Sequence, residues 1–357
     1  MKSGKTITEL AMEIERRREL KRDYLVPTQK LAMSPDLQIS AGDLTVGVND
    51  LAHGQIAAHL GIPKAYYDRM KQEAPALLAD NVNTWFAAKP ETRMLRTLDG
   101  KARAFLSDRY RALENEDLAE AALPAIADLG LDIVSSEITD RRLYIKAVDS
   151  RVTRELKKQG AAFGDGGHTI VRCLSPAITL SNSEVGLGPV SILGGTYDSF
   201  CSNLAFFGER SLKKYHVGAK HELAGEDIYA LLSDKTRNLS DAALWSQIGD
   251  IIKIAFDRAK FDALVNKIEG AAEDKIDDAV KVVDLSAKRF ALNDTEKTSV
   301  LKRLIEGADL SRMGLHNAIT RASQDVADYD RATELERVGG QVIELKRNEW
   351  AELAAAA

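Results

Sequence analysis

The sequence predicts an α+β fold, in which a mixed antiparallel sheet with helices is followed by a helical C-terminal domain. Segments rich in β-branched and aromatic residues, separated by turn residues, recur between residues 102 and 202. After residue 225 helical periodicity dominates, and proline is absent beyond Pro189. A chain of 357 residues also suits about two domains, which we place at residues 1–222 and 223–357.

The first 70 residues predict helices separated by short strands and turns. Residues 5–23 carry apolar side chains at helical spacing, whereas residues 24–50 contain the prolines and glycines that mark turns. Residues 55–70 are typical of two helices joined tightly, because Gly61 suits a helix C-cap and Pro63 suits the first turn of the next helix. The pair resembles a helix-turn-helix, so reading of duplex DNA is an alternative function for this segment.

The middle of the chain predicts a series of strands. The segment Leu143–Val148 follows a turn at Thr139–Arg141, so we expect it to be the second arm of a hairpin. Helices are expected between strands at Asn115–Leu129 and Val152–Gly160. The expected strands are Ala102–Leu113, Leu131–Ser136, Arg142–Val148, His168–Leu180 and Gly188–Ser202.

Beyond residue 225 the sequence predicts helices with identifiable ends. Ser240-Asp241 suits the N-cap of a helix whose apolar residues continue to Phe256. Asn293–Glu296 resembles a capping box. A further helix is expected over Asn317–Glu336, and Gly339-Gly340 is expected to break it.

Composition and motifs disfavour several classes of protein. No run approaches the ~18 apolar residues that cross a bilayer, and the charged start lacks the apolar region of a secretory signal. With two cysteines, we expect a reducing, cytoplasmic compartment. Ser3–Thr6 lacks the first glycine and the strand of a phosphate-binding loop, and neither H-E-x-x-H nor C-x-x-C occurs. We therefore expect no cofactor and no metal, and a non-enzymatic function is favoured.

The net charge of −5 conceals an uneven distribution. Residues 1–221 hold 30 basic and 28 acidic residues, whereas residues 222–357 hold 19 and 26. Three windows are basic: residues 93–111 carry +4, residues 141–158 carry +5 and residues 210–221 carry +4. This distribution excludes a strongly basic coat and leaves room for a localised nucleic-acid groove.

Aromatic residues interleave with these cations, as single-strand binding requires, because cations follow phosphates and rings stack on bases. The alternative is a solvated face of Lys and Arg over aromatic side chains that pack inward. The candidate nucleic-acid-binding residues are Arg103, Phe105, Arg109, Tyr110, Arg111, Arg141, Arg142, Tyr144, Lys146, Lys213, Lys214 and His216.

Four groups of motifs occur in order along the chain. They are Leu60–Pro63 with Tyr66-Tyr67, then Ala104–Arg111, then Ser181–Gly186 followed by Cys201–Leu204 and His216–Gly218, and finally Asn317–Thr320. Together they resemble the phage/plasmid-like protein family of prophages and plasmids, over residues 55–335. That family usually has Cys-Thr-Asn-Gly where this chain has Cys201–Leu204, which puts in doubt any role that needs close main-chain approach there.

The resemblance implies a mobile-element context and carries no established enzymatic activity. By architecture and charge the chain is also similar, more distantly, to phage single-strand annealing proteins of the RecT and Redβ type, which assemble into rings or filaments. That analogy implies binding and annealing of single-stranded DNA in recombination, without nucleotide hydrolysis, by a homo-oligomer away from membranes.

Two other functions stay open. One is a non-enzymatic interaction or assembly protein with a host protein partner, for example an inhibitor of a host defence complex. The other is a metal-dependent nuclease that would use Asp108, Glu184 and His216.

Overall fold

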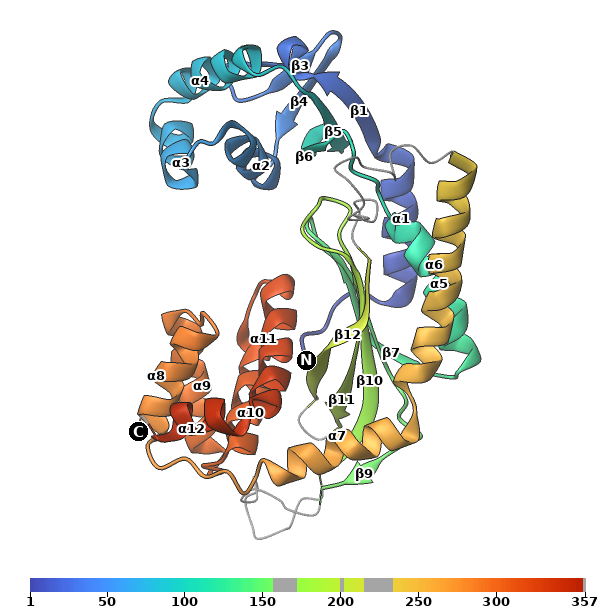
Figure 1. Ribbon diagram of the computed structural model, residues 1–357, viewed down its shortest axis with the longest axis vertical. Helices are drawn as coiled ribbons and strands as arrows, with labels where there is room; N and C mark the ends of the chain where they lie inside the picture. Colours follow the sequence, from blue (N-terminus) through green and yellow to red (C-terminus); the bar gives the residue numbers. More distant parts are fainter. Residues whose placement is uncertain (157–171, 200–201, 215–233, 356–357) are drawn as a thin grey trace, which may run out of the picture.

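The computed structural model describes residues 1–156, 172–199, 202–214 and 234–355 (Figure 1). The described chain is α+β, as predicted, with two sheets and a C-terminal part that is helical. Figure 1 shows the first sheet with its helices at the top, the second sheet in the middle, and helices on both sides of the second sheet. None of the helices in these residues has the length and apolarity of a membrane span.

The first sheet has the strand order β1-β5-β6-β4-β3-β2, with β4 and β6 parallel and the other neighbours antiparallel. Its core includes Tyr67, Phe86 and Phe105. Gly61 caps a helix at φ 70°, as its sequence context predicted. The elements are β1 (Arg22–Pro27), β2 (Ala32–Met33), β3 (Ile39–Ala41), β4 (Leu44–Val48), α2 (Asp50–Leu60), α3 (Lys64–Glu73), α4 (Pro75–Ala88), β5 (Thr92–Leu98) and β6 (Lys101–Ser107).

The second sheet is antiparallel, with the order β12-β11-β10-β8-β7 and a short strand, β9, paired with β10. The hairpin predicted around Thr139–Arg141 joins β7 to β8. The helix expected at Val152–Gly160 is wrong over its described part, because Arg154 and Glu155 pair with β10. The strands are β7 (Asp132–Ile138), β8 (Leu143–Val148), β9 (Arg154–Glu155), β10 (Cys173–Asn182), β11 (Val190–Asp198) and β12 (Asn203–Lys214).

One face of the second sheet is covered by α1 (Ile7–Leu20), α5 (Asn115–Asp128) and α6 (Asp234–Ala255). Alternate residues of the strands, such as Ile145 and Leu180, join apolar residues of these helices in one core. Helix α6 begins before the Ser240 expected as its cap, and it packs in this core. The helices after residue 222 therefore do not all belong to a separate helical unit.

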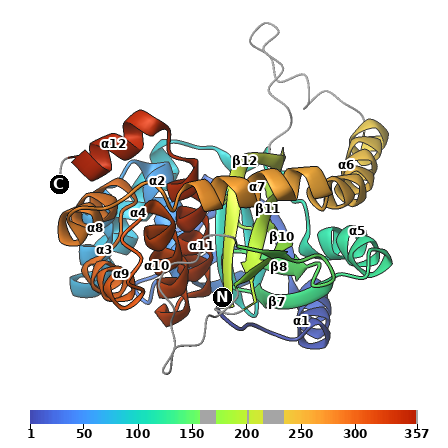
Figure 2. The same cartoon turned by 90° about the horizontal axis from the view of Figure 1, so that it is seen from below.

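Helices α7 to α12 lie on the opposite side of the second sheet. Figure 2 shows α7 crossing the strands, and α10 and α11 lie against β12. Helices α8 to α12 share a core of their own, and the capping box predicted at Asn293 is present. These helices are α7 (Arg258–Gly270), α8 (Ala279–Arg289), α9 (Asp294–Glu306), α10 (Arg312–Ala322), α11 (Tyr329–Glu344) and α12 (Arg347–Ala355).

Two adjacent glycines let α11 pack closely against its neighbours, Gly339 against α10 and Gly340 against β12. Gly339 and Gly340 lie buried inside α11, so the expectation that they break a helix is wrong. A Cβ at Gly340 would lie 1.7 Å from the carbonyl oxygen of Phe206 in β12. Glycine is therefore required by the contact between helix and strand, at some cost in helix propensity.

Candidate functional site

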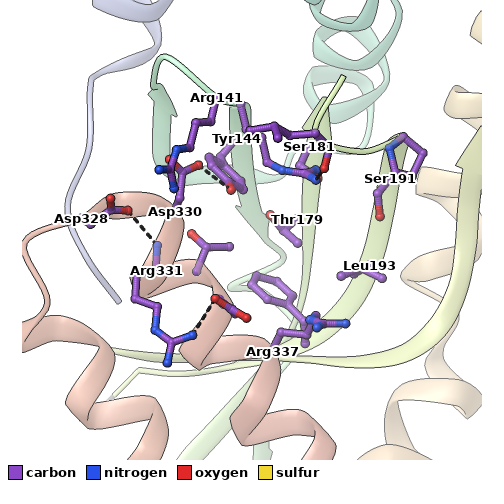
Figure 3. A pocket seen from close by; sticks show the side chains of 16 residues that line it. Arg141, Tyr144, Thr179, Ser181, Ser191, Leu193, Asp328, Asp330, Arg331 and Arg337 are labelled. Atoms are coloured by element: carbon purple, nitrogen blue, oxygen red, sulfur yellow. Dashed lines mark hydrogen bonds and ion pairs between the residues drawn. The ribbon is translucent and has the colours of Figure 1, made fainter. Parts of the chain in front are cut away.

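A cavity of about 550 Å³ lies between α11 and the second sheet (Figure 3). Because side chains alternate along a strand, the residues between those of the apolar core point toward α11. On this face the strands present Tyr144, Thr179, Ser181 and Ser191 to the cavity. These four side chains are polar, whereas the strand residues between them belong to the apolar core on the opposite face.

An ion pair fixes α11 to this polar face. The Lys146 ammonium, with 0% of the residue exposed, donates to a Glu336 carboxylate oxygen at 2.7 Å and to the Thr333 hydroxyl at 2.9 Å. It also lies 4.6 Å from the ring centre of Tyr329. Burial lowers the pKa of Lys146, against the attraction of Glu336. Lys146 therefore holds the fold together and is not available to a ligand.

Tyr144 is held at the edge of the cavity by the same helix. Its hydroxyl donates to an Asp330 carboxylate oxygen at 2.8 Å, and its ring lies 5.5 Å from that of Tyr329. Burial raises the pKa of Tyr144, and burial also raises the pKa of Asp330. The tyrosine is therefore a fixed wall of the cavity.

Two arginines at the cavity have exposed side chains. Arg141 lies in the turn before β8, and Arg337 projects from α11. Within the described part of the chain, neither guanidinium has an ion-pair partner. By contrast, Arg142 donates to the carbonyl of Leu187, and Arg331 pairs with Glu296. Arg141 and Arg337 are thus the cations that can accept an external anion.

A second cavity, of about 1120 Å³, lies beside α2 and the first sheet. Arg141 and Leu187 line both cavities, so the two adjoin at these residues. Lys101 lines the second cavity without an ion-pair partner among the described residues. We call the combined feature the two-cavity groove; its other lysines, Lys64 and Lys71, pair with Asp68 and Asp50.

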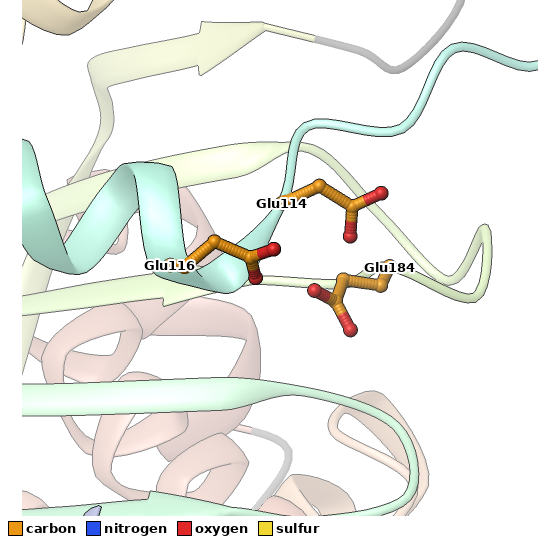
Figure 4. A group of neighbouring side chains, drawn as sticks. All are labelled: Glu114, Glu116 and Glu184. Carbon is orange, nitrogen blue, oxygen red and sulfur yellow. The ribbon is translucent and has the colours of Figure 1, made fainter. Parts of the chain in front are cut away.

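Three glutamates gather near the junction of the two sheets (Figure 4). Glu114, Glu116 and Glu184 bring carboxylate oxygens within 4.8 Å of one another. The Lys21 ammonium already contacts all three, at 2.7, 2.6 and 3.4 Å. A cation of the chain itself therefore lies where a metal ion would bind.

Two arginines complete this network. Arg103 donates to Glu184 at 2.8 Å, and Arg96 donates to Glu114 at 2.6 Å. Burial raises the pKa of Glu114 to about 7, whereas Arg103, against the effect of burial, lowers the pKa of Glu184. The network joins the first sheet to the second, and its charges are matched internally.

The structure corrects the location of several predicted groove residues. Arg103 is buried in its pair with Glu184, Phe105 packs in the core of the first sheet, and Lys146 is buried under α11. Strands β6 and β8 are covered on both faces, since Ala102–Leu106 and Leu143–Val148 are buried throughout, so the cations within these runs point into the protein. These three side chains cannot reach a polynucleotide in this structure.

The other predicted residues lie in different places. Arg109 is exposed, Tyr110 donates to the carbonyl of Ser183, and Arg111 pairs with Asp241 of α6. Of the predicted set, Arg141, Arg142 and Tyr144 line the groove. Lys213 and Lys214 end β12 with side chains outside the described part, and His216 lies outside the described residues.

The alternative functions have less support in the geometry. For the nuclease, Asp108 is exposed, Glu184 is buried against Arg103, and His216 lies outside the described residues. For duplex reading, Arg69 of α3 pairs with Glu73. The helix-turn-helix therefore presents cations that are already neutralised.

Sequence reasoning missed Lys101, Thr179, Ser181, Ser191 and Arg337 as groove residues. A signal was present in β10, where Thr179 and Ser181 alternate with Ile178 and Leu180. When polar residues alternate with apolar ones along a buried strand, the polar residues indicate a face that lines a polar space. No family model, curated protein or solved structure matches the chain.

Proposed function

We propose that this protein binds single-stranded DNA in the two-cavity groove. The observation that carries the proposal is a series of three cations: Lys101 in one cavity, Arg337 in the other, and Arg141 where they adjoin. None of them has an ion-pair partner among the described residues, so each can take a phosphate without breaking an internal pair.

The size of the groove favours an extended ligand. The cavities measure about 550 and 1120 Å³ and adjoin, so together they exceed the ~300–1,000 Å³ of an ordinary small-molecule pocket. Several acids of the groove already have cationic partners, because Asp50 pairs with Lys71 and Glu334 pairs with Arg331. An incoming polyanion therefore meets less repulsion than the count of acids suggests.

Phosphate contacts supply most of the expected affinity. The aromatic side chains at the cavity under α11, Tyr144 and Phe206, are largely buried, which limits base stacking. Binding is therefore expected to be nearly independent of sequence and steeply dependent on salt. Annealing, self-association and a role in recombination remain predictions from the sequence.

The test is fluorescence anisotropy of a labelled dT oligonucleotide in a salt series from ~50 to ~200 mM. Three phosphate contacts predict a slope of log K against log salt of about −2. The double variant Arg141→Ala/Arg337→Ala should bind more weakly, and its slope should be shallower by about 1.4.

A matched control is Arg347→Ala/Lys89→Ala, which removes the same charge at exposed positions outside the groove. This control should leave the slope unchanged. Absence of binding at ~50 mM salt, or affinity that is flat with salt, would contradict the proposal and favour the interaction-protein alternative. Equal binding of duplex DNA would contradict the single-strand assignment.

A further inference from the structure

The polar face of the second sheet has a feature that phosphate binding does not explain. Thr179 lies in β10 with 3% of its surface exposed, and it lines the cavity under α11 (Figure 3). Its hydroxyl oxygen is buried without a hydrogen-bond partner. A buried hydroxyl without a hydrogen-bond partner lowers the free energy of unfolding, whereas a valine side chain of the same shape would not.

The neighbours of Thr179 extend this polar surface. Ser181 is the next residue on the same face of β10, and Ser191 of β11 pairs with it across the sheet. All three line the cavity, and each hydroxyl can both donate and accept a hydrogen bond. They form a hydroxyl floor, defined by these three residues, that can bind the edge of a polar group.

The other walls are apolar or cationic. Phe206 and Leu193 line the cavity beside the hydroxyl floor, and the unpaired Arg141 and Arg337 also line it. A flat ring with a polar edge, attached to a phosphate, matches this combination of surfaces. A cavity of about 550 Å³ also has room for one nucleotide.

We propose that this cavity takes one nucleobase of a bound strand, with the edge of the base on the hydroxyl floor and the flanking phosphates at Arg141 and Arg337. The inference rests on the proposed function, since the strand delivers the base. It adds a contribution to affinity that requires a base and that salt does not screen. Phosphate contacts alone would give an affinity that does not depend on a base and that salt screens.

The experiment compares a dT decamer with an abasic decamer that has the same phosphates. Wild-type protein should bind the dT decamer about tenfold more tightly at a fixed salt concentration, as one well-placed base would provide. Ser191→Leu places a large side chain in the cavity, so it should remove the difference in affinity between the two decamers. Thr45→Leu, at an exposed strand position outside the cavity, is the control and should keep the tenfold preference.

Thr179→Val provides a second, independent readout. It removes the hydroxyl and keeps the side-chain shape, so it should reduce the preference for dT and also raise the melting temperature. A lower melting temperature would show that the hydroxyl serves the fold and would overturn its assignment to a ligand.

The outcomes separate the two proposals. If both decamers bind equally with a steep salt dependence, the base site is wrong and the groove proposal stands. If neither decamer binds at ~50 mM salt, the groove proposal fails and the base site fails with it. A preference for dT that Ser191→Leu retains would place the base elsewhere and would also overturn the inference.

Discussion

The two faces of the second sheet differ in chemistry although the same strands supply both. Toward α5 and α6 the strands present Ile145, Ile178 and Leu180, which are fully buried in a continuous apolar core. Toward α11 they present Lys146, which pairs with Glu336, and also Thr179 and Ser181, which line the cavity. The apolar face therefore stabilises the fold, whereas the face toward α11 contains a polar cavity at some cost in stability.

The largest effect is expected from breaking the ion pair under α11. Glu336→Leu leaves the fully buried Lys146 without its partner, so it should lower the free energy of unfolding by about 3–5 kcal/mol. Lys146→Met/Glu336→Leu removes both charges and should recover most of this loss. Urea denaturation of the single and double variants measures the difference, and a double variant as unstable as the single one would contradict it.

A smaller effect comes from acid. Burial lowers the pKa of His316, in α10, to about 4, and its Nδ1 lies 2.8 Å from the carbonyl oxygen of Gly339. The unfolded state binds the proton more tightly, so stability is complete above about pH 6.5 and falls as the pH drops toward 4, by about 3 kcal/mol.

Denaturation at a series of pH values measures this dependence. His316→Gln, which keeps a donor without a titrating ring, should flatten it in part. His53, in the first sheet unit, should account for a share of the remainder, because burial lowers its pKa to about 4 as well. If His316→Gln showed the same dependence of stability on pH as the wild type, His316 would not be a source of that dependence.

Truncation of adjacent residues tests the comparison of the two faces most directly. Leu180→Ala, on the apolar face, should lower the free energy of unfolding by about 3 kcal/mol, because it leaves a cavity in a packed core. Ser181→Ala, one residue later on the polar face, should change it by less than about 0.5 kcal/mol. Similar losses at both positions, measured by denaturation, would contradict the proposed division of roles.

Much of the fold follows from local sequence signals. The hairpin between β7 and β8, the cap at Gly61 and the capping box at Asn293 depend on residues near one another in the chain. Such signals act within a few residues, so the local structure can be predicted from them without the tertiary structure. The α+β class follows from the same kind of information.

The errors came from contacts between distant segments. The basic windows predict that Arg103 and Lys146 line a groove, but the pairing of Arg103 with Glu184 and of Lys146 with Glu336 is set by tertiary packing. Gly339-Gly340 was interpreted from helix propensity, which a contact with β12 overrides. The candidate site was therefore only partly predictable, because charge is visible in the sequence and burial is not.

The contact at Gly340 has a consequence for how any ligand enters. Main-chain atoms of α11 and β12 meet there, so no side-chain rearrangement can bring the helix nearer to the sheet at that point. The neighbouring cavity therefore cannot become narrower at that point when a ligand binds. The entropic cost of assembling a recognition surface is then met during folding, and association should resemble insertion into a preformed slot.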